Sequence, residues 1–216
     1  MIPVLISLVP GLITLVFIAR GKLSLWISAI VGGAGWLVAL VLRLPILNLI
    51  NMLHMINSSY IIITSALMAG IFEEITRYYV LRFRIRRNLS LANILSVGLG
   101  WGLTEALLIY AMQVPISAIM FGYDWVKFLP GAFERNIAIA LHIGMSFLTI
   151  PAILGGNIIY LILAIATHTI VDALAAYTMM LLKNLWITEA ITALVVIAVV
   201  IPVVRYVKSY LLRHKM

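Results

Sequence analysis

Seven long apolar runs constrain the fold of this chain more than any other feature of its sequence. A helix that crosses the hydrocarbon core of a bilayer needs about 20 mostly apolar residues, and each run comes close to that length. The sequence therefore predicts an all-α, polytopic transmembrane bundle of about seven helices, in a single domain that covers residues 1–216. The runs lie at about residues 2–19, 23–42, 59–81, 91–112, 135–153, 158–182 and 185–205.

The composition excludes an ordinary soluble domain. Hydrophobic residues make up 64% of the chain and charged residues 10%, and the mean hydropathy is +1.17. Soluble domains carry about 25% charged residues. The chain has no cysteine, which excludes disulfides, cysteine-ligated metals and thiol catalysis. The net charge is +8, but the basic residues lie in short segments between apolar runs, so the predicted partner is the membrane lipid and not nucleic acid.

The distribution of basic residues predicts an orientation. The first apolar run has no basic segment before it and is followed by Arg20 and Lys22, which favours a spanning helix over a cleaved signal peptide. With the N-terminus outside and the C-terminus in the cytoplasm, the inner segments hold ten basic residues and the outer segments hold four, as the positive-inside rule requires. We therefore predict a multi-pass protein of a prokaryotic cytoplasmic membrane. The outer four are Arg43, Lys127, Arg135 and Lys183.

Two further patterns concern local structure. Residues 44–57 form a stretch too short to span, with polar residues at every third position, which predicts a short helix at the membrane interface. Glycine and alanine recur at spacings typical of close helix packing, as in Ala66 and Gly70 or Gly98 and Gly102. The polar residues of the short stretch are Asn48, Asn51, His54 and Asn57.

Ionisable residues inside the predicted spans are the main functional signal. The chain has only seven acids; Asp124 and Glu134 are assigned to the fourth loop, whereas four others fall within spans. A charged residue at the centre of a bilayer costs about 2.5–3.5 kcal/mol on insertion scales. At about 1.5 Å per helical residue, two of the acids and two histidines reach the middle of the membrane. The buried acids are Glu73, Glu74, Glu105 and Asp172, and the histidines are His142 and His168.

The spacing and charge of these residues limit what they can do. Glu73 and Arg77 are four residues apart and share a helix face, as do His168 and Asp172. Each pair alone fits a structural ion pair or a satisfied hydrogen bond. However, four buried carboxylates face one buried arginine, and unpaired carboxylates in a low dielectric need protons or a cation. With two histidines nearby, the cluster is predicted to hold a divalent metal, a set of shared protons, or both.

Several intramembrane chemistries are excluded by residue type. The HExxH motif of zinc proteases is absent. An aspartyl intramembrane protease needs two buried aspartates, and only Asp172 qualifies. A rhomboid-like serine protease needs a Gly-x-Ser-Gly sequence, but Ser146 is followed by Phe147. A retinal protein needs a lysine deep in the last span, and Lys183 precedes that span.

The remaining motifs, in their order on successive spans, resemble the YhfC-type intramembrane metalloproteases, relatives of the CAAX- and bacteriocin-processing (CPBP) and PrsW membrane proteases. The resemblance covers about residues 59–182. It departs from the CAAX enzymes in having two residues between the paired glutamates and Arg77, and acids at positions 105 and 172. These departures are more similar to the YhfC and PrsW branches. The motifs are Glu73, Glu74 and Arg77, then Trp101 and Glu105, then His142, then His168 and Asp172.

The resemblance implies a role for each of these residues. Glu73 would activate water as a general base, supported by Glu74 and by Arg77, which would orient a carboxylate. Glu105 and His142 would hold the water or a metal. The last motif, His168 oriented by Asp172, would stabilise the oxyanion or bind the metal. The implied cofactor is a divalent metal, zinc above all, with the ligand set Glu105, His142 and His168.

The implied function is a glutamate-dependent intramembrane peptidase that hydrolyses a peptide bond in or near the bilayer, in a membrane-anchored peptide or protein. Two alternatives remain open. A proton- or cation-coupled transporter would use the same carboxylates and histidines as a relay, with polar residues continuing to both faces of the membrane. A non-catalytic relative would keep the motifs only as structure and bind membrane partners. The sequence does not predict an oligomeric state.

Overall fold

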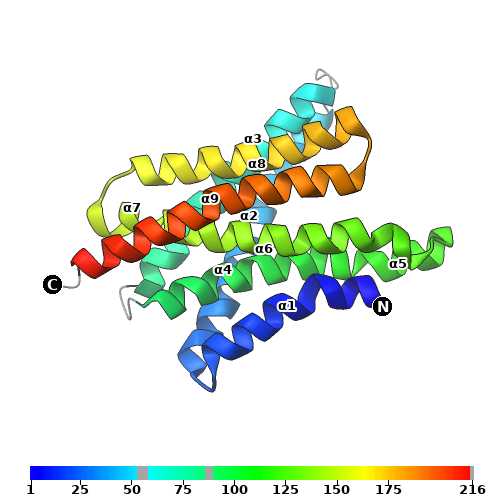
Figure 1. The fold of residues 1–216 in the computed structure, drawn as a ribbon. Helices are drawn as coiled ribbons and strands as arrows, with labels where there is room; N and C mark the ends of the chain where they lie inside the picture. The colour runs from blue at the N-terminus through cyan, green and yellow to red at the C-terminus, as the bar shows by residue number, and fades with distance from the viewer. Residues whose placement is uncertain (53–57, 86–89, 215–216) are drawn as a thin grey trace.

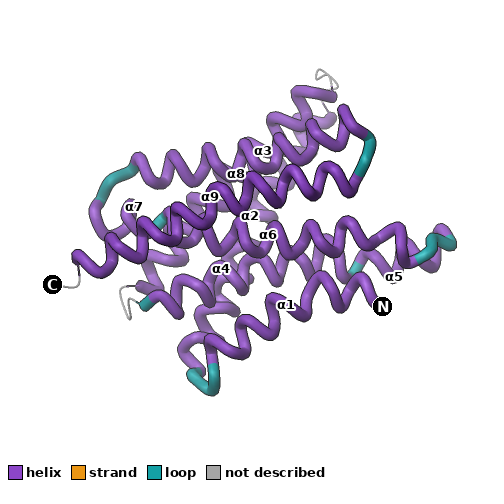
Figure 2. The backbone as a smooth tube through the Cα atoms, viewed as in Figure 1, coloured by secondary structure: helices purple, strands orange, loops and turns teal. Residues whose placement is uncertain are grey.

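The computed structural model describes residues 1–52, 58–85 and 90–214, and within these residues it contains helices joined by short loops and no strand (Figures 1 and 2). The helices run up and down the bundle, and the two termini lie at opposite ends of it (Figure 1). The elements are α1 (Ile2–Ala19), α2 (Leu23–Met52), α3 (Ser58–Ile85), α4 (Leu91–Glu105), the π-helix η1 (Ala106–Ala111), α5 (Gln113–Phe121), the 3-10 helix η2 (Trp125–Phe128), α6 (Leu129–Leu148), α7 (Ile150–Gly155), α8 (Ile159–Leu182) and α9 (Leu185–His214).

The predicted all-helical membrane fold is confirmed. Six helical segments of the described chain are long and apolar enough to cross a membrane. The third predicted span, residues 59–81, corresponds to α3, which is not among these six segments. This helix carries Glu73, Glu74 and Arg77 near its middle. That helix nevertheless packs along both α2 and α8, so its charged centre lies inside the bundle. The orientation and the single-domain assignment stay predictions.

The interfacial helix predicted for residues 44–57 is wrong where the structure describes it. Residues 44–52 continue α2 without a break, and Pro45 lies inside that helix. At Leu44 this continuation of α2 lines a cavity between helices. His54 and Asn57 lie outside the described residues.

Glycine allows α2 and α4 to touch along their backbones. A Cβ atom at Gly100 would lie 1.8 Å from the carbonyl oxygen of Ala29, and one at Gly32 would lie 2.2 Å from that of Val97. Such close approach is the usual way in which membrane helices gain packing contacts. The predicted close packing is thus confirmed for this helix pair, and it fixes α4 against the rest of the bundle.

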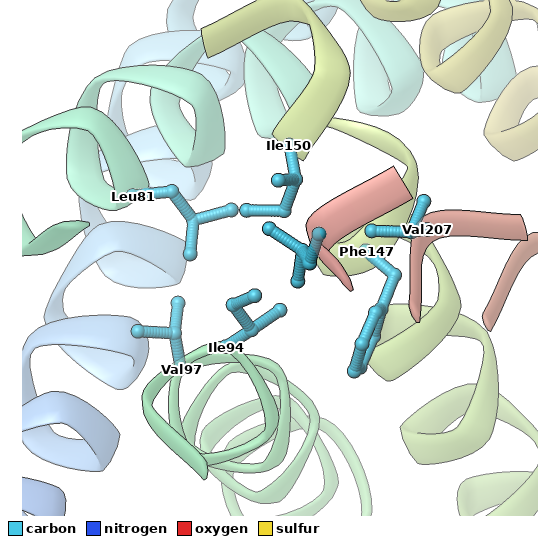
Figure 3. Packing of buried hydrophobic residues seen from close by; sticks show 7 residues of the cluster. Leu81, Ile94, Val97, Phe147, Ile150 and Val207 are labelled. Carbon is cyan, nitrogen blue, oxygen red and sulfur yellow. The ribbon is translucent and has the colours of Figure 1, made fainter. Parts of the chain in front are cut away.

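An apolar cluster fills the bundle at the end where α3 finishes and α4 begins (Figure 3). Its side chains come from α3, α4, α6, α7 and α9 and are 5% exposed or less. The cluster begins about one helical turn beyond Arg77 on α3, so it lies between the ionisable residues and this end of the bundle. Its members are Leu81, Ile94, Val97, Phe147, Ile150, Val207 and Leu211.

Candidate active site

A cavity of about 550 Å³ lies between α2, α3, α6 and α8 and reaches the last residue of α4. Its lining comes from the second half of α2, from residues 61–73 of α3, from residues 134–142 of α6 and from residues 168–176 of α8. Most of the wall is aliphatic, and the ionisable residues gather at its deep end and along two sides. These are Arg43, Glu73, Glu105, Glu134, Arg135, His142, His168 and Asp172.

Glu73 is held through both carboxylate oxygens. Arg43 on α2 donates to its Oε1 at 2.7 Å, and the Trp101 indole N–H on α4 donates to its Oε2 at 2.9 Å. The side chain is 3% exposed, and that small exposure faces the cavity. Three helices therefore fix one carboxylate at the cavity wall, where charge-assisted hydrogen bonds are strong.

Glu74 and Arg77 form a buried pair behind Glu73. Arg77 Nε lies 3.0 Å from Glu74 Oε2, and both side chains are fully buried. The guanidinium also lies 4.3 Å from the centre of the Trp101 ring and donates to the His142 carbonyl oxygen at 2.8 Å. Arg77 therefore orients a carboxylate, as the resemblance implied, and that carboxylate belongs to Glu74. The alternative of a simple Glu73–Arg77 ion pair is not formed, because Glu73 is turned toward α2 and α4.

Glu105 ends α4 at the point where the helix widens into the π-helix η1. Arg135 on α6 donates to its Oε1 at 2.8 Å, and His142 Nε2 lies 2.7 Å from its Oε2. Single π turns in helices are frequent at functional sites. Here the change of helical pitch directly follows the residue whose carboxylate joins α4 to α6.

The hydrogen bonds of His142 fix where its proton lies. An arginine can only donate, so the Arg77 N–H that lies 2.9 Å from His142 Nδ1 requires Nδ1 to accept. The proton of the neutral ring must then be on Nε2, which donates it to Glu105. This arrangement presents His142 to the cavity as a hydrogen-bond donor.

His168 has the opposite arrangement. Its Nδ1 lies 2.6 Å from Glu74 Oε1, so this carboxylate accepts the Nδ1 proton, and the neutral ring carries its lone pair on Nε2. Nε2 faces the cavity, 4.0 Å from Glu73 Oε2 and 3.5 Å from Asp172 Oδ2, so in a protonated ring it would donate toward these carboxylates. Asp172, predicted to orient this ring, lies on the cavity side of it and is 39% exposed. The buried Glu74 makes the shorter contact and holds the ring in place.

The predicted residues therefore meet in one place. All seven lie on or directly behind the cavity wall, and the His142 and His168 rings are 5.6 Å apart between centres. A family model described as YhfC intramembrane metalloprotease matches residues 5–126 and 123–192, which include every one of them. The chain belongs to the YhfC family.

A curated relative of this YhfC-family chain is the "Uncharacterized membrane protein YhfC" of Bacillus subtilis (strain 168). The two are 29% identical over 167 residues, which are 62% of this chain and 63% of the relative. The matched part is thus less than two thirds of the relative's length. The family match confirms the resemblance to YhfC and the multi-pass membrane location. The wider relationship to the CAAX-processing and PrsW proteases stays a prediction.

The metalloprotease description of the YhfC family implies a divalent metal, and the site contains suitable ligands. Glu73, Glu105 and His142 each offer one ligand atom, and these atoms lie within 4.8 Å of one another. This set includes Glu73 in place of the predicted His168. Distance favours His142 as the nitrogen ligand. The hydrogen bonds favour His168, because of the two neutral rings only that of His168 carries its lone pair on Nε2, which faces the cavity. Glu105 and His142 are common to the predicted set and to this one.

Sequence reasoning missed three ionisable residues of the YhfC-family site. Arg43 and Arg135 were assigned to outer loops and Glu134 to the fourth loop, but all three lie within helices and line the cavity. The arginines each bind a glutamate of the site, so the predicted ratio of four carboxylates to one arginine becomes five carboxylates to three arginines, and a smaller excess of carboxylates remains. For Arg43 the available signal was the apolar run that resumes after it, from Leu44 to Ile50.

Glu134 and Arg135 were missed because the fifth apolar run predicts a helix that begins only at residue 135. Helix α6 begins at Leu129 and carries both charged residues in its second turn. Arg135 pairs with Glu134 as well as with Glu105. The signal for this helix start was Pro130, since proline favours the first turn of a helix.

Proposed function

We propose that this chain is an intramembrane peptidase that uses Glu73 to activate water for hydrolysis of a peptide bond. The observation that carries the proposal is the convergence of Glu73, Glu105, His142 and His168, from four separate helices, on one cavity with aliphatic walls. A peptidase needs this geometry, because water and a peptide carbonyl must meet acids, bases and donors at one point.

The residues divide into acceptors and donors around that point. Glu73 and the Nε2 of a neutral His168 accept the protons of a bound water. As the water oxygen bonds to the carbonyl carbon, one water proton passes to Glu73. The proton then passes from Glu73 to the leaving nitrogen as the carbon–nitrogen bond breaks. A positioned general base of this kind typically contributes about 10²–10⁴-fold to the rate.

The oxyanion that forms on the carbonyl oxygen needs donors aimed at it. Arg43 and Arg135 are 16% and 14% exposed, and both face the cavity. Each guanidinium carries five N–H donors, and the contacts with the glutamates leave some of them free. We assign oxyanion stabilisation to these two arginines.

The donor set fits a divalent metal. Four carboxylates and two guanidinium groups line the cavity, so with neutral histidines the carboxylates exceed the cations by the charge of one divalent ion. Glu73 and Glu105 would hold the ion, with His168 or His142 as the nitrogen ligand, and zinc suits this mixture of oxygen and nitrogen. When bound, it would polarise the water and the carbonyl group as a Lewis acid.

The transporter alternative is disfavoured by the apolar cluster of Figure 3. A transported proton or cation must pass polar groups on both sides of the central site. On the side where α3 ends, the apolar cluster that contains Leu81, Ile94 and Val97 begins one helical turn beyond Arg77. The cavity, by contrast, extends from the ionisable residues in the other direction only. A site that is open toward one side only is compatible with hydrolysis, whereas transport needs a path to both sides.

Comparison of protein N-termini tests the proposal. Membranes and medium from bacteria that make the wild-type chain are compared with those from cells that make Glu73→Gln. New N-termini should occur with the wild type and fall at least ~100-fold with the variant, the loss expected when a general base is removed. Equal cleavage by Glu73→Gln would reject the mechanism.

A matched control separates chemistry from folding. Glu189 is a largely buried acid on α9 that lines a separate groove and not the cavity. Glu189→Gln makes the same chemical change in the same fold and should leave the new N-termini unchanged. Metal content of purified wild-type protein should be about one divalent ion per chain and should fall in Glu105→Gln.

A further inference from the structure

The cavity opens toward one end of the bundle only. Its lining residues on α3 run from Ile61, near the start of the helix, to Glu73 near its middle, and those on α8 run from His168, near the middle of the helix, toward its end at Ala176. Exposure rises along the same direction, from 2% at Glu73 to 38% at Ile61. The mouth therefore lies at the end where α2 finishes, α3 begins and α8 finishes.

The basic residues lie at the opposite end. The link between α1 and α2, the last turn of α3 and the second half of α9 are all at the closed end of the cavity (Figure 1). They carry Arg20, Lys22, Arg82, Arg84, Arg205, Lys208 and Arg213. With Arg43 and Arg135 inside the cavity, the described basic residues at its open end are Lys127 and Lys183. The difference in basic residues between the two ends of the bundle is thus larger than the sequence indicated, because Arg43 and Arg135, two of the four residues predicted to lie outside, belong to the site.

We propose that the cavity opens away from the cytoplasm, so that the site acts on apolar peptide segments presented from the outer half of the membrane. The positive-inside rule places the arginine-rich end in the cytoplasm. The apolar cluster of Figure 3 closes the site on that side. The inference names the substrate class of the proposed peptidase and to that extent rests on it.

The rim of the cavity indicates the chemistry of the segment that enters. Leu44 on α2 and Ile61 on α3 are 43% and 38% exposed, and both line the cavity. Behind them the walls are built from small residues, Ala66 and Ala69 on α3 and Ala175 and Ala176 on α8, which leave room for bulkier side chains. An apolar rim in front of small wall residues suits a chain segment with aliphatic side chains next to the bond that is cut.

Cysteine labelling tests the direction of opening without any activity, and the chain is suited to it because it has no native cysteine. Ala176→Cys places a thiol on the cavity wall, and Ser65→Cys places another on the opposing helix. Lys22→Cys is the control at the closed, basic end, where the residue is exposed. Intact bacteria are treated with a membrane-impermeant maleimide, and the label is normalised to that obtained after denaturation in detergent.

The expected result is labelling of Ala176→Cys and Ser65→Cys in intact cells, with Lys22→Cys labelled only after permeabilisation. Labelling of Lys22→Cys in intact cells, with the cavity positions protected, would invert the orientation and overturn the proposal. Protection of both cavity positions in intact and permeabilised cells would show that water does not enter from this end, which also overturns it. Two cavity positions on different helices guard against one variant that fails to fold.

The positions of the cleaved bonds separate this inference from the proposed function. Wild-type-dependent N-termini should map to the outer half of spanning segments, or just outside them, with aliphatic residues beside the cut. Cuts on the cytoplasmic side would overturn the direction of access but leave the peptidase intact. Outward labelling without any wild-type-dependent cut would support the direction of opening and reject the peptidase.

Discussion

The guanidinium of Arg43 donates to Oε1 of Glu73 at 2.7 Å, across the interface between α2 and α3. The other oxygen of Glu73 accepts from Trp101, so the carboxylate is fixed from two sides. Arg135 and His142 hold Glu105 in the same way, from α6. Both glutamates that could ligate a metal are therefore oriented by donors on other helices. Such outer partners usually matter nearly as much as the ligands themselves.

Substitution of Arg43 should weaken the site without unfolding the bundle. Arg43→Gln removes the charge that fixes Glu73, and we expect metal affinity and cleavage to fall about 10–100-fold, the usual loss for an outer-shell partner. Arg43→Lys should retain part of both, since it keeps the charge but loses the forked geometry. Metal content of the purified protein and the amount of the new N-termini measure the two effects.

The matched control for Arg43 is Arg82, an exposed arginine in the last turn of α3. Arg82→Gln removes the same charge outside the cavity and should change neither metal content nor cleavage. Full metal binding and cleavage by Arg43→Gln would show that the contact with Glu73 is incidental.

Removal of one partner of the Glu74–Arg77 pair should destabilise the protein more than removal of one partner of a surface ion pair. Both side chains are fully buried, and removing one leaves a charge without its partner. Arg77→Met should therefore cost about 3–5 kcal/mol in the free energy of unfolding. The double variant Glu74→Gln/Arg77→Met should lose less than the sum of the two single variants, because no unpaired charge remains. Unfolding in mixed micelles measures all four proteins, and additive losses would contradict direct coupling.

The sequence was sufficient for the fold class because the apolar runs and their length fix it directly. It was also sufficient to bring Glu73, Glu105, His142 and His168 to one level, since depth in a membrane follows from position along a helix. It was not sufficient for the partners. Whether Arg77 binds Glu73 or Glu74 depends on how α3 is rotated against its neighbours, and tertiary packing decides that rotation.

The errors at Arg43 and Arg135 have a common cause. In the sequence, a charged residue interrupts each apolar run, which predicts that α2 ends before Arg43 and that α6 begins at Arg135. Both helices continue past it, because each arginine finds a glutamate on a neighbouring helix. The stabilising contact lies on α3 for Arg43 and at the end of α4 for Arg135, so neither is visible in the local sequence.

Close packing of α2 against α4 predicts a severe effect at Gly100. A Cβ atom there would lie 1.8 Å from the backbone oxygen of Ala29, and a backbone cannot move aside as a side chain can. Gly100→Ala should therefore abolish the folded protein or shift the two helices apart, with loss of stable expression. The control is Gly155→Ala, whose nearest neighbour is the flexible end of Tyr210, at 2.8 Å. Size-exclusion profiles in detergent measure both, and a normal profile for Gly100→Ala would contradict the packing.

The proton positions of the two histidines give the sharpest test of the site's electrostatics. Because Arg77 donates to His142 Nδ1, the neutral ring of His142 should carry its proton on Nε2. Because Glu74 accepts from His168 Nδ1, that ring should carry its proton on Nδ1. Nitrogen NMR of labelled, metal-free protein in detergent distinguishes the two tautomers, with His142→Gln and His168→Gln variants to assign the signals.

Nitrogen NMR of the Arg77→Met variant shows whether Arg77 determines the tautomer of His142. Loss of the donor at Nδ1 should free His142 to populate both tautomers, while His168, bound to Glu74, should be affected less. If instead His142 carries its proton on Nδ1 in the wild-type protein, its Nε2 lone pair faces Glu73 and Glu105. His142 would then be the nitrogen ligand of the site, and the assignment of His168 to that position would be wrong.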